Sequence, residues 1–151
     1  GDKRAMVCVD CAKQRFAGSP IPYAFSTCAI EDYGIMADRD KLLLADATIC
    51  FEVLEHVADP FTVLAAARAV TKPGGLMLFS TPNGAIEQGW LPDWDKVEYK
   101  GHVRAPTLAD FNAWLEYAAT GRRLTGGYAP IGKWTVTFSP DSLMLGAVTR
   151  G

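Results

Sequence analysis

The stretch that decides the fold is "DATICFEVLEHVADP", residues Asp46 to Pro60. Its apolar opening, rich in β-branched and aromatic residues, predicts a buried strand. The Asp-Pro at its end predicts the start of a helix, because proline is favoured in the first helical turn. Between the two, the chain presents Glu52, Glu55 and His56. Two acids and an imidazole at the end of a strand indicate either a chemical site or a polar helix start.

The same alternation of strands and helices extends to both sides of this stretch. Apolar runs bounded by turn residues predict four strands, at Ala5–Asp10, Tyr23–Thr27, Ala47–Phe51 and Leu76–Thr81. Helices are predicted for "CAKQRFAG", which closes on Gly18, and for "DPFTVLAAARAVT". This rhythm predicts an α/β fold in which a mostly parallel sheet carries helices on both faces.

The chain beyond Pro82 changes character. A long stretch rich in Gly, Pro and Trp, "NGAIEQGWLPDWDKVEYKGHVRAP", is typical of a functional loop. "TLADFNAWLEYAATG" then predicts a capped helix, with Thr107 as N-cap, Asp110 three residues later and Gly121 past the end. Two further strands are predicted around "RRLTGGYA" and "SLMLGAVTR".

Composition limits the function classes. A chain of 151 residues with 49% hydrophobic and 21% charged content fits one globular domain with a core. Its net charge of -2 gives no general attraction to nucleic acid or to an anionic membrane. No apolar run approaches the roughly 20 residues that a membrane span needs. We therefore expect a cytoplasmic protein without nucleic-acid partners or a membrane span, whose partner is a small molecule or another protein.

The four cysteines are Cys8, Cys11, Cys28 and Cys50. Cysteine outside disulfides usually behaves as a small buried apolar residue, and this interpretation is favoured. Cys8 and Cys11 form a C-x-x-C pair, which could be half a zinc site or a redox pair. No second pair follows at ligand spacing, so we assign no metal.

From about Val7 to the C-terminus, and most densely between Asp46 and Gly84, the sequence resembles the class I S-adenosylmethionine-dependent methyltransferases, in particular the small-molecule enzymes related to ubiquinone biosynthesis. The features that agree come in order: D-x-I before the strand, E-V-L-E-H-V after it, D-P opening the helix, R-x-x-K-P-G-G before the next strand and S-T-P-N at its end. The resemblance implies a Rossmann-like fold, S-adenosylmethionine as cofactor, and methyl transfer to an oxygen or carbon of a small-molecule acceptor.

The acids and the histidine acquire candidate roles from this resemblance. Ligands of such sheets bind outside the carboxyl ends of strands, where Phe51 and Glu52 are expected to contact the cofactor. If the following residues form a helical turn, Glu52, Glu55 and His56 share one face. His56 could then act as the general base, with Glu55 orienting its ring. The three side chains could also hold a divalent cation, or be an ordinary helix start beside Asp59.

Further cofactor residues follow from the family pattern. Asp10 matches an acid that binds the ribose hydroxyls, although it could equally be an N-cap of the helix after it. Cys28 and Ala29 stand where the family has an Asp and a small residue facing adenine. A thiol does not accept hydrogen bonds as a carboxylate does, so the resemblance implies that backbone groups contact the adenine.

The candidate acceptor residues are Asn83, directly after a strand, and His102, which precedes a helix together with Arg104. Trp90, Trp94 and Tyr99 could wall the acceptor or simply pack the loop against the body.

The family's glycine-rich loop, E/D-x-G-x-G-x-G, does not occur in these 151 residues. We therefore expect residues 1–151 to be one methyltransferase domain that begins near the family's second strand and is incomplete at its N-terminus. The alternative is a catalytically inactive methyltransferase-like module that binds a partner. A nicotinamide-dinucleotide protein fits the fold class, but no G-x-G-x-x-G follows a strand.

Overall fold

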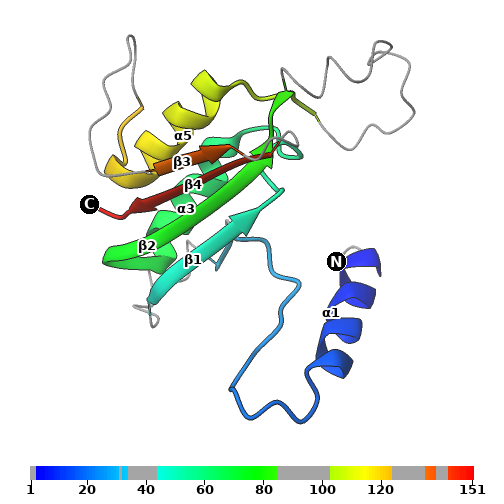
Figure 1. The fold of residues 1–151 in the computed structure, drawn as a ribbon. Coiled ribbons are helices and arrows are strands. Elements are labelled where there is room, and N and C mark those ends of the chain that lie inside the picture. Colours follow the sequence, from blue (N-terminus) through cyan, green and yellow to red (C-terminus); the bar gives the residue numbers. More distant parts are fainter. Residues whose placement is uncertain (1–2, 31, 34–43, 85–102, 124–134, 139–142) are drawn as a thin grey trace, which may run out of the picture.

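A computed structural model describes residues 3–30, 32–33, 44–84, 103–123, 135–138 and 143–151. Helices and strands alternate along the chain as far as α5, and two strands follow it (Figure 1). They are α1 (Lys3–Arg15), β1 (Ala45–Phe51), α3 (Pro60–Val70), β2 (Thr71–Pro82), α5 (Leu108–Thr120), β3 (Thr135–Phe138) and β4 (Leu143–Thr149).

The four described strands form one sheet in the order β1-β2-β4-β3. β1 and β2 are parallel and connected through α3, whereas β4 is antiparallel to both β2 and β3. Connecting parallel strands through a helix is characteristic of α/β folds, so the predicted fold class is confirmed. The described part of the sheet is mixed, since one of its three strand pairs is parallel.

The core lies between one face of the sheet and the helices α3 and α5. Alternate residues of β2 and β4, such as Met77, Phe79 and Met144, point to this face and are fully buried. Helix α3 contributes Val63 and Leu64. Because α3 and α5 also contact each other, they lie side by side over the same face of the sheet (Figure 1).

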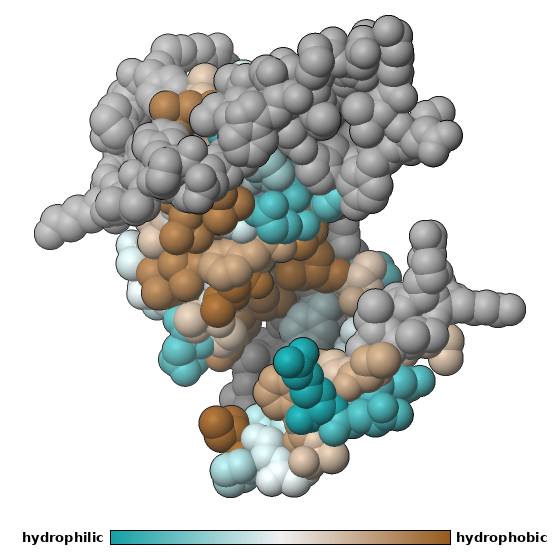
Figure 2. Space-filling model, turned by 45° about the vertical axis from the view of Figure 1, so that its right-hand side comes forward, coloured by the Kyte–Doolittle hydropathy of each residue, from teal (hydrophilic) through white to brown (hydrophobic). Residues whose placement is uncertain are grey.

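The opposite face of the sheet is open among the described residues. Figure 2 shows hydrophobic side chains gathered in the middle of the molecule. Four large ones come from the strands and are each at least 38% exposed: Ile49, Phe51, Leu76 and Leu145. Of the described helices, α3 and α5 cover the core face, and α1 lies away from the sheet (Figure 1).

Both helix starts predicted from capping signals are confirmed. Asp59 is the N-cap of α3, and its carboxylate accepts a hydrogen bond from Phe61 N at 3.0 Å. Thr107 and Asp110 form a reciprocal capping box at the start of α5. Gly121 ends α5 in the left-handed conformation, with φ of 76°.

Two predicted strands near the N-terminus are wrong. Ala5–Asp10 lies inside helix α1, whose sequence "KRAMVCVDCAKQR" surrounds a short apolar run with strong helix formers. Tyr23–Thr27 has no regular secondary structure, and Tyr23 and Phe25 instead pack against Phe16 with ring centroids 5.7 and 5.6 Å away. The first described element of the chain is therefore a helix, α1, and not a strand.

The C-terminal predictions are partly confirmed. Within the run "SLMLGAVTR", Leu143–Thr149 forms β4. Of the predicted strand "RRLTGGYA", Arg122 and Arg123 are not in a strand, and the rest lies outside the described residues. The strand β3 was not predicted. Within the described part of the chain, no helix is both long and apolar enough to cross a membrane.

Candidate active site at the carboxyl ends of β1 and β2

The carboxyl ends of β1 and β2 lie at the same edge of the sheet, where Phe51 pairs with Ser80. Residues 52–58, here called the site turn, lead from this edge to α3. They form turns and bends, closed by a hydrogen bond of 3.0 Å from His56 N to Val53 O. The prediction that Glu52, Glu55 and His56 share one face of a helical turn is therefore wrong.

Glu52 is held in a strained conformation by Ser80. Its φ of 54° lies in the left-handed region that non-glycine residues rarely adopt. Its backbone N–H donates to Ser80 O and to Ser80 Oγ at 3.1 and 3.2 Å, and Ser80 Oγ donates to Glu52 Oε1 at 2.8 Å. Such strain persists only where surrounding contacts impose it, and it concentrates at functional sites.

Glu55 is a buried acid rather than an exposed one. It is 0% exposed, and Thr81 Oγ1 donates a hydrogen bond of 3.1 Å to Glu55 Oε2. Glu55 Oε1 has no hydrogen-bond partner among the described residues, and it lies 3.6 Å from His56 Nε2. His56 remains partly exposed, with 35% of its side chain accessible. Glu55 and His56 therefore form a pair in which the acid lies inside and the imidazole at the surface.

The two acids are held on opposite faces of β2. Ser80 and Thr81 are consecutive strand residues, whose side chains point to opposite faces. Ser80 contacts Glu52 and Thr81 contacts Glu55. The sequence analysis assigned no role to either hydroxyl, although two adjacent hydroxyl residues at the end of a buried strand are themselves a signal of polar partners nearby.

The pKa of the Cys50 thiol is raised in the folded protein. Burial, with a smaller contribution from the charge of Glu55, raises the pKa of the Cys50 thiol to about 11. Cys50 is a free, buried cysteine near the end of β1. It is therefore a protonated core residue at neutral pH, as predicted, whereas the prediction of burial is wrong for Cys11 and Cys28, which are exposed.

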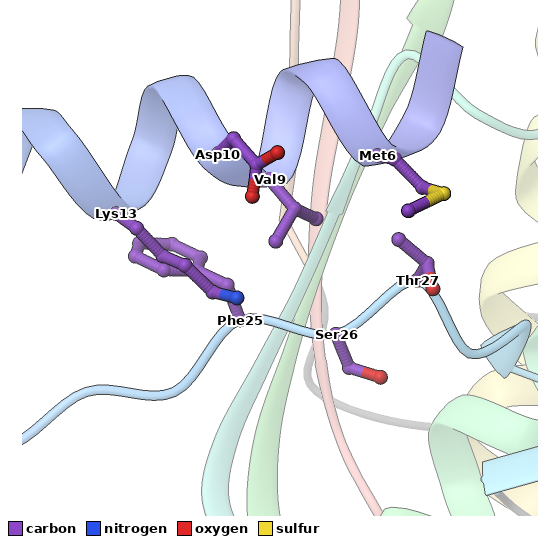
Figure 3. Close-up of a pocket in the computed structure, with 7 residues that line it drawn as sticks. All are labelled: Met6, Val9, Asp10, Lys13, Phe25, Ser26 and Thr27. Carbon is purple, nitrogen blue, oxygen red and sulfur yellow. The ribbon is translucent and has the colours of Figure 1, made fainter. Parts of the chain in front are cut away.

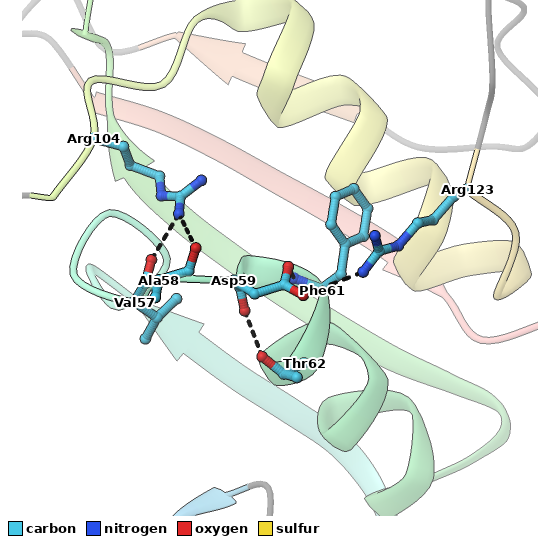
Figure 4. A network of polar contacts seen from close by, with 7 residues as sticks. All are labelled: Val57, Ala58, Asp59, Phe61, Thr62, Arg104 and Arg123. Carbon is cyan, nitrogen blue, oxygen red and sulfur yellow. Dashed lines mark hydrogen bonds and ion pairs between the residues drawn. The ribbon is translucent and has the colours of Figure 1, made fainter.

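A second segment, residues 103–106, holds the site turn from outside. Val103 N donates to Glu55 O at 2.9 Å. Arg104 Nη2 donates to Val57 O and Ala58 O at 2.8 and 2.6 Å (Figure 4). At its other end, Pro106 O accepts a hydrogen bond of 2.8 Å from Gly84 N, just after β2. We call residues 103–106 the clasp segment.

Only glycine fits at position 84 beside this clasp segment. A Cβ on Gly84 would lie 2.3 Å from the carbonyl carbon of Ala105. Asn83, the predicted acceptor residue, directly precedes it and is half-buried at the edge where the strands end. His102 and the aromatic residues Trp90, Trp94 and Tyr99 lie outside the described residues, so their predicted roles stay predictions.

The other predicted cofactor residues lie elsewhere. Asp10 is in the middle of α1, so it neither ends a strand nor caps a helix. It lines a pocket of about 410 Å³ between α1 and residues 25–27 (Figure 3). The lining residues are Met6, Val9, Asp10, Lys13, Phe25, Ser26 and Thr27. Cys28 is exposed just after this pocket, and its thiol donates to Ala29 O at 3.4 Å.

The C-x-x-C pair lies within helix α1, where Cys11 is free and exposed. In the described part of the chain, no group of three or more His, Cys, Asp or Glu side chains is arranged to hold a metal ion.

Comparisons with known proteins match this geometry. A family model described as a methyltransferase domain matches residues 14–118. The chain belongs to the class I S-adenosylmethionine-dependent methyltransferases. It is 39% identical to the ubiquinone biosynthesis O-methyltransferase of Vibrio vulnificus (strain YJ016) over 70 residues, which are 46% of this chain and 27% of that protein. The same enzyme of Cereibacter sphaeroides is 58% identical over 38 residues, covering 25% of this chain and 15% of that protein.

Solved structures of methyltransferases share the fold. The N-methyltransferase NodS from Bradyrhizobium japonicum WM9 matches with a TM-score of 0.57 and 18% identity, covering 95% of this chain and 68% of that one. An O-methyltransferase family protein from Burkholderia thailandensis matches with a TM-score of 0.56 and 13% identity, covering 94% of this chain and 41% of that one. The matches to the two curated relatives span about a quarter of their length or less.

The edge where β1 and β2 end fits the methyl donor that this family uses. S-adenosylmethionine carries a positive sulfonium and an adenine ring. Glu52 offers an exposed carboxylate, which suits a cation, and Phe51 offers an aromatic ring that is 46% exposed. Asp10 lies within α1, which Figure 1 shows away from the sheet.

Proposed function

We propose that this protein transfers the methyl group of S-adenosylmethionine to an oxygen or carbon of a small-molecule acceptor. The observation that carries the proposal is the pair of buried Glu55 and partly exposed His56, 3.6 Å apart, beside the strained Glu52 at the carboxyl edge of the sheet. Backbone strain of the kind seen at Glu52 concentrates at functional sites.

In this proposal Phe51 and Glu52 hold the cofactor, which supplies an electrophilic methyl group when bound. His56 takes the proton from an acceptor hydroxyl, because imidazole titrates near neutral pH. The nearby Glu55 carboxylate stabilises the imidazolium that results, since the two charges would lie in a site partly shielded from water. Asn83 and His102 contact the acceptor.

The acceptor class we infer is a phenol or catechol. Several curated relatives bear the name ubiquinone biosynthesis O-methyltransferase, which supports a phenolic oxygen as the methylated atom. A phenolic hydroxyl has a pKa near 10, so a single base suffices to remove its proton during transfer.

A second candidate is a methyltransferase-like module that binds a partner without catalysis. The open apolar face of the sheet, with Ile49 61% exposed, favours this candidate. A transfer assay separates the two, because only the enzyme moves a methyl group.

The test uses tritium-labelled S-adenosylmethionine and a catechol probe, 3,4-dihydroxybenzoate. Wild-type protein should label the probe, and His56→Ala should lower turnover by about 100-fold to 10,000-fold, the usual contribution of a general base. A matched control is Asp46→Asn, at the opposite end of β1, which should leave turnover unchanged. Chelator treatment of the wild type decides between a base and a metal ligand, since only a metal-dependent site loses activity. Unchanged turnover in His56→Ala would refute the role of His56.

A further inference from the structure

The site turn carries His56 on a segment that has no regular secondary structure. One hydrogen bond, from His56 N to Val53 O, closes the turn on itself. The backbone on either side of His56 is held by contacts from a distant part of the chain. Those contacts fix the backbone from which the imidazole extends.

The clasp segment binds the carbonyl groups that flank His56. Val103 N donates to Glu55 O at 2.9 Å, on the N-terminal side. On the C-terminal side, Arg104 Nη2 donates to Val57 O and Ala58 O at 2.8 and 2.6 Å (Figure 4). The peptide groups on both sides of His56 are thus fixed by two consecutive residues.

Arg104 is itself positioned by the core. Its guanidinium lies over the ring of Trp114, 6.0 Å from the centroid, and Trp114 is only 5% exposed within α5. A guanidinium is planar and stacks on aromatic rings while it donates hydrogen bonds in fixed directions. Arg104 therefore links helix α5 to the site turn.

We propose that Arg104 is a positioning residue for His56. It touches neither cofactor nor acceptor in this proposal, which rests on the proposed methyl transfer. Instead it fixes the Val57 and Ala58 peptides, and through them the ring of His56 relative to Glu55 Oε1. A displacement of about 1 Å in a reacting group can cost 100-fold in rate.

The test compares Arg104→Lys with a matched control, Arg123→Lys. Arg123 also stacks on an aromatic ring, 4.1 Å from the centroid of Phe61, and lies 3.3 Å from Asp59 Oδ2, but it does not contact the described site turn carbonyls (Figure 4). Lysine keeps the charge at both positions and loses the planar fork. We expect Arg104→Lys to lower kcat for 3,4-dihydroxybenzoate by about 10-fold to 100-fold with KM for S-adenosylmethionine within about twofold, and Arg123→Lys to change neither.

A second readout does not depend on activity. The chain has two histidines, so the imidazole signals of a histidine-labelled sample can be assigned by comparison with His56→Ala. In Arg104→Lys, the His56 ring signals and their titration midpoint should shift, whereas Arg123→Lys should leave them in place. If Arg104→Lys did not fold, Arg104→Gln would take its place in both measurements.

Equal kcat values and unmoved His56 signals in the two arginine variants would overturn the proposal. If the wild type transferred no methyl group at all, the proposed function would fail. The ring signals would still decide whether Arg104 positions His56.

Discussion

Ionisable side chains lie at both ends of the β1–β2 pair, but they differ in their hydrogen bonding. At the carboxyl end, here called the site end, an exposed imidazole and a strained glutamate lie beside a buried carboxylate. At the amino end, here called the anchor end, Arg68 Nη1 donates to the carbonyls of Ala118 and Ala119 at 2.5 and 2.6 Å. Arg150 donates to Thr71 O, and Gly151 N to Ala119 O at 2.9 Å.

The two ends differ in which polar atoms lack a hydrogen-bond partner. At the anchor end, Arg68 binds carbonyls at the C-terminus of α5, where a positive charge is favoured by the helix dipole, and Arg150 binds Thr71 O. At the site end, an acceptor, Glu55 Oε1, lacks a hydrogen-bond partner among the described residues and Glu52 remains exposed, whereas at the anchor end a guanidinium donor, Arg150 Nε, lacks one. Polar groups whose hydrogen bonds are all made within the protein stabilise the fold. A polar group that lacks a partner is available to a ligand or a proton. Substitutions at the two ends should therefore separate activity from stability.

After His56→Ala, the largest effect is expected for Glu55→Gln at the site end. The amide keeps the shape of the side chain and can still accept from Thr81, but it removes the charge beside His56. Carboxylate partners of functional histidines in metal sites contribute 10-fold to 100-fold, so turnover should fall by up to about 100-fold, or roughly 2.8 kcal/mol. Steady-state kinetics with the catechol probe measure this loss.

The same variant should keep or gain stability, because a buried charge without full hydrogen bonding is costly. Urea denaturation of Glu55→Gln is the control. A clear loss of stability with normal turnover would assign Glu55 to structure and remove the distinction between the two ends.

The next effect belongs to Arg68→Ala at the anchor end. Burial, followed by the charge of Arg150, lowers the pKa of the Arg68 guanidinium from its ordinary value. The Arg68→Ala variant loses two hydrogen bonds to the end of α5. Each hydrogen bond to a charged group contributes about 1.5 kcal/mol or more to stability before the structure relaxes. We expect about 2 kcal/mol less stability in urea denaturation.

Turnover per folded Arg68→Ala molecule should be unchanged, and Arg68→Lys should recover part of the lost stability. If turnover fell while the urea midpoint stayed the same, the anchor end would be coupled to the chemistry and the comparison would fail.

Sequence patterns predicted the elements whose signals are local. The start of α3 follows from Asp59 and Pro60, and the limits of α5 follow from Thr107, Asp110 and Gly121. Each of these signals acts within about four residues, so the sequence alone contains the whole interaction. The parallel pairing of β1 with β2 also followed, because an apolar run on each side of a helix has few other solutions.

Patterns were wrong where a short apolar run decided the assignment. Ala5–Asp10 is too short to distinguish a buried strand from a helix by periodicity, and its flanks of Lys, Arg, Ala and Gln favour a helix. The site was predicted in part: Glu52, Glu55 and His56 do gather where β1 ends. The burial of Glu55 could not be predicted, because its partner Thr81 lies 26 residues away, and Arg104 contacts Val57 across 47 residues.

A smaller effect should appear at high pH, through Cys50. Its ordinary pKa of 9.0 is raised to about 11 in the folded protein, chiefly by burial and then by the charge of Glu55. Between these values the unfolded chain loses the thiol proton and the folded protein keeps it, so stability falls as pH rises. The loss should reach about 1.4 kcal/mol at pH 10.

Urea denaturation of the wild type and of Cys50→Ala at pH 8 and pH 10 isolates this loss, because other titrating groups are common to both proteins. Cys50→Ala should lose about 1.4 kcal/mol less than the wild type between the two pH values. Equal losses would show that Cys50 ionises normally in the folded state. Combining this change with Glu55→Gln should reduce the Cys50 contribution, since one of its two causes is then removed.

The smallest effect is expected for Thr107→Ala. This variant tests whether a residue at the site end whose polar groups are all hydrogen-bonded affects stability alone or turnover as well. Thr107 lies at the site end, directly after the clasp segment, yet its polar groups are fully engaged. Its hydroxyl accepts from Asp110 N at 3.2 Å and donates to Asp110 Oδ2 at 2.7 Å, and its own N–H donates to the same oxygen at 2.9 Å. Loss of an N-cap hydroxyl typically costs about 1 kcal/mol, so thermal or urea denaturation should show a loss of that size with turnover unchanged. Asp110→Asn is the matched control, because it keeps an acceptor and should cost less. If Thr107→Ala lowered turnover as Arg104→Lys is expected to, the start of α5 would belong to the support of His56, and the site end would extend into that helix.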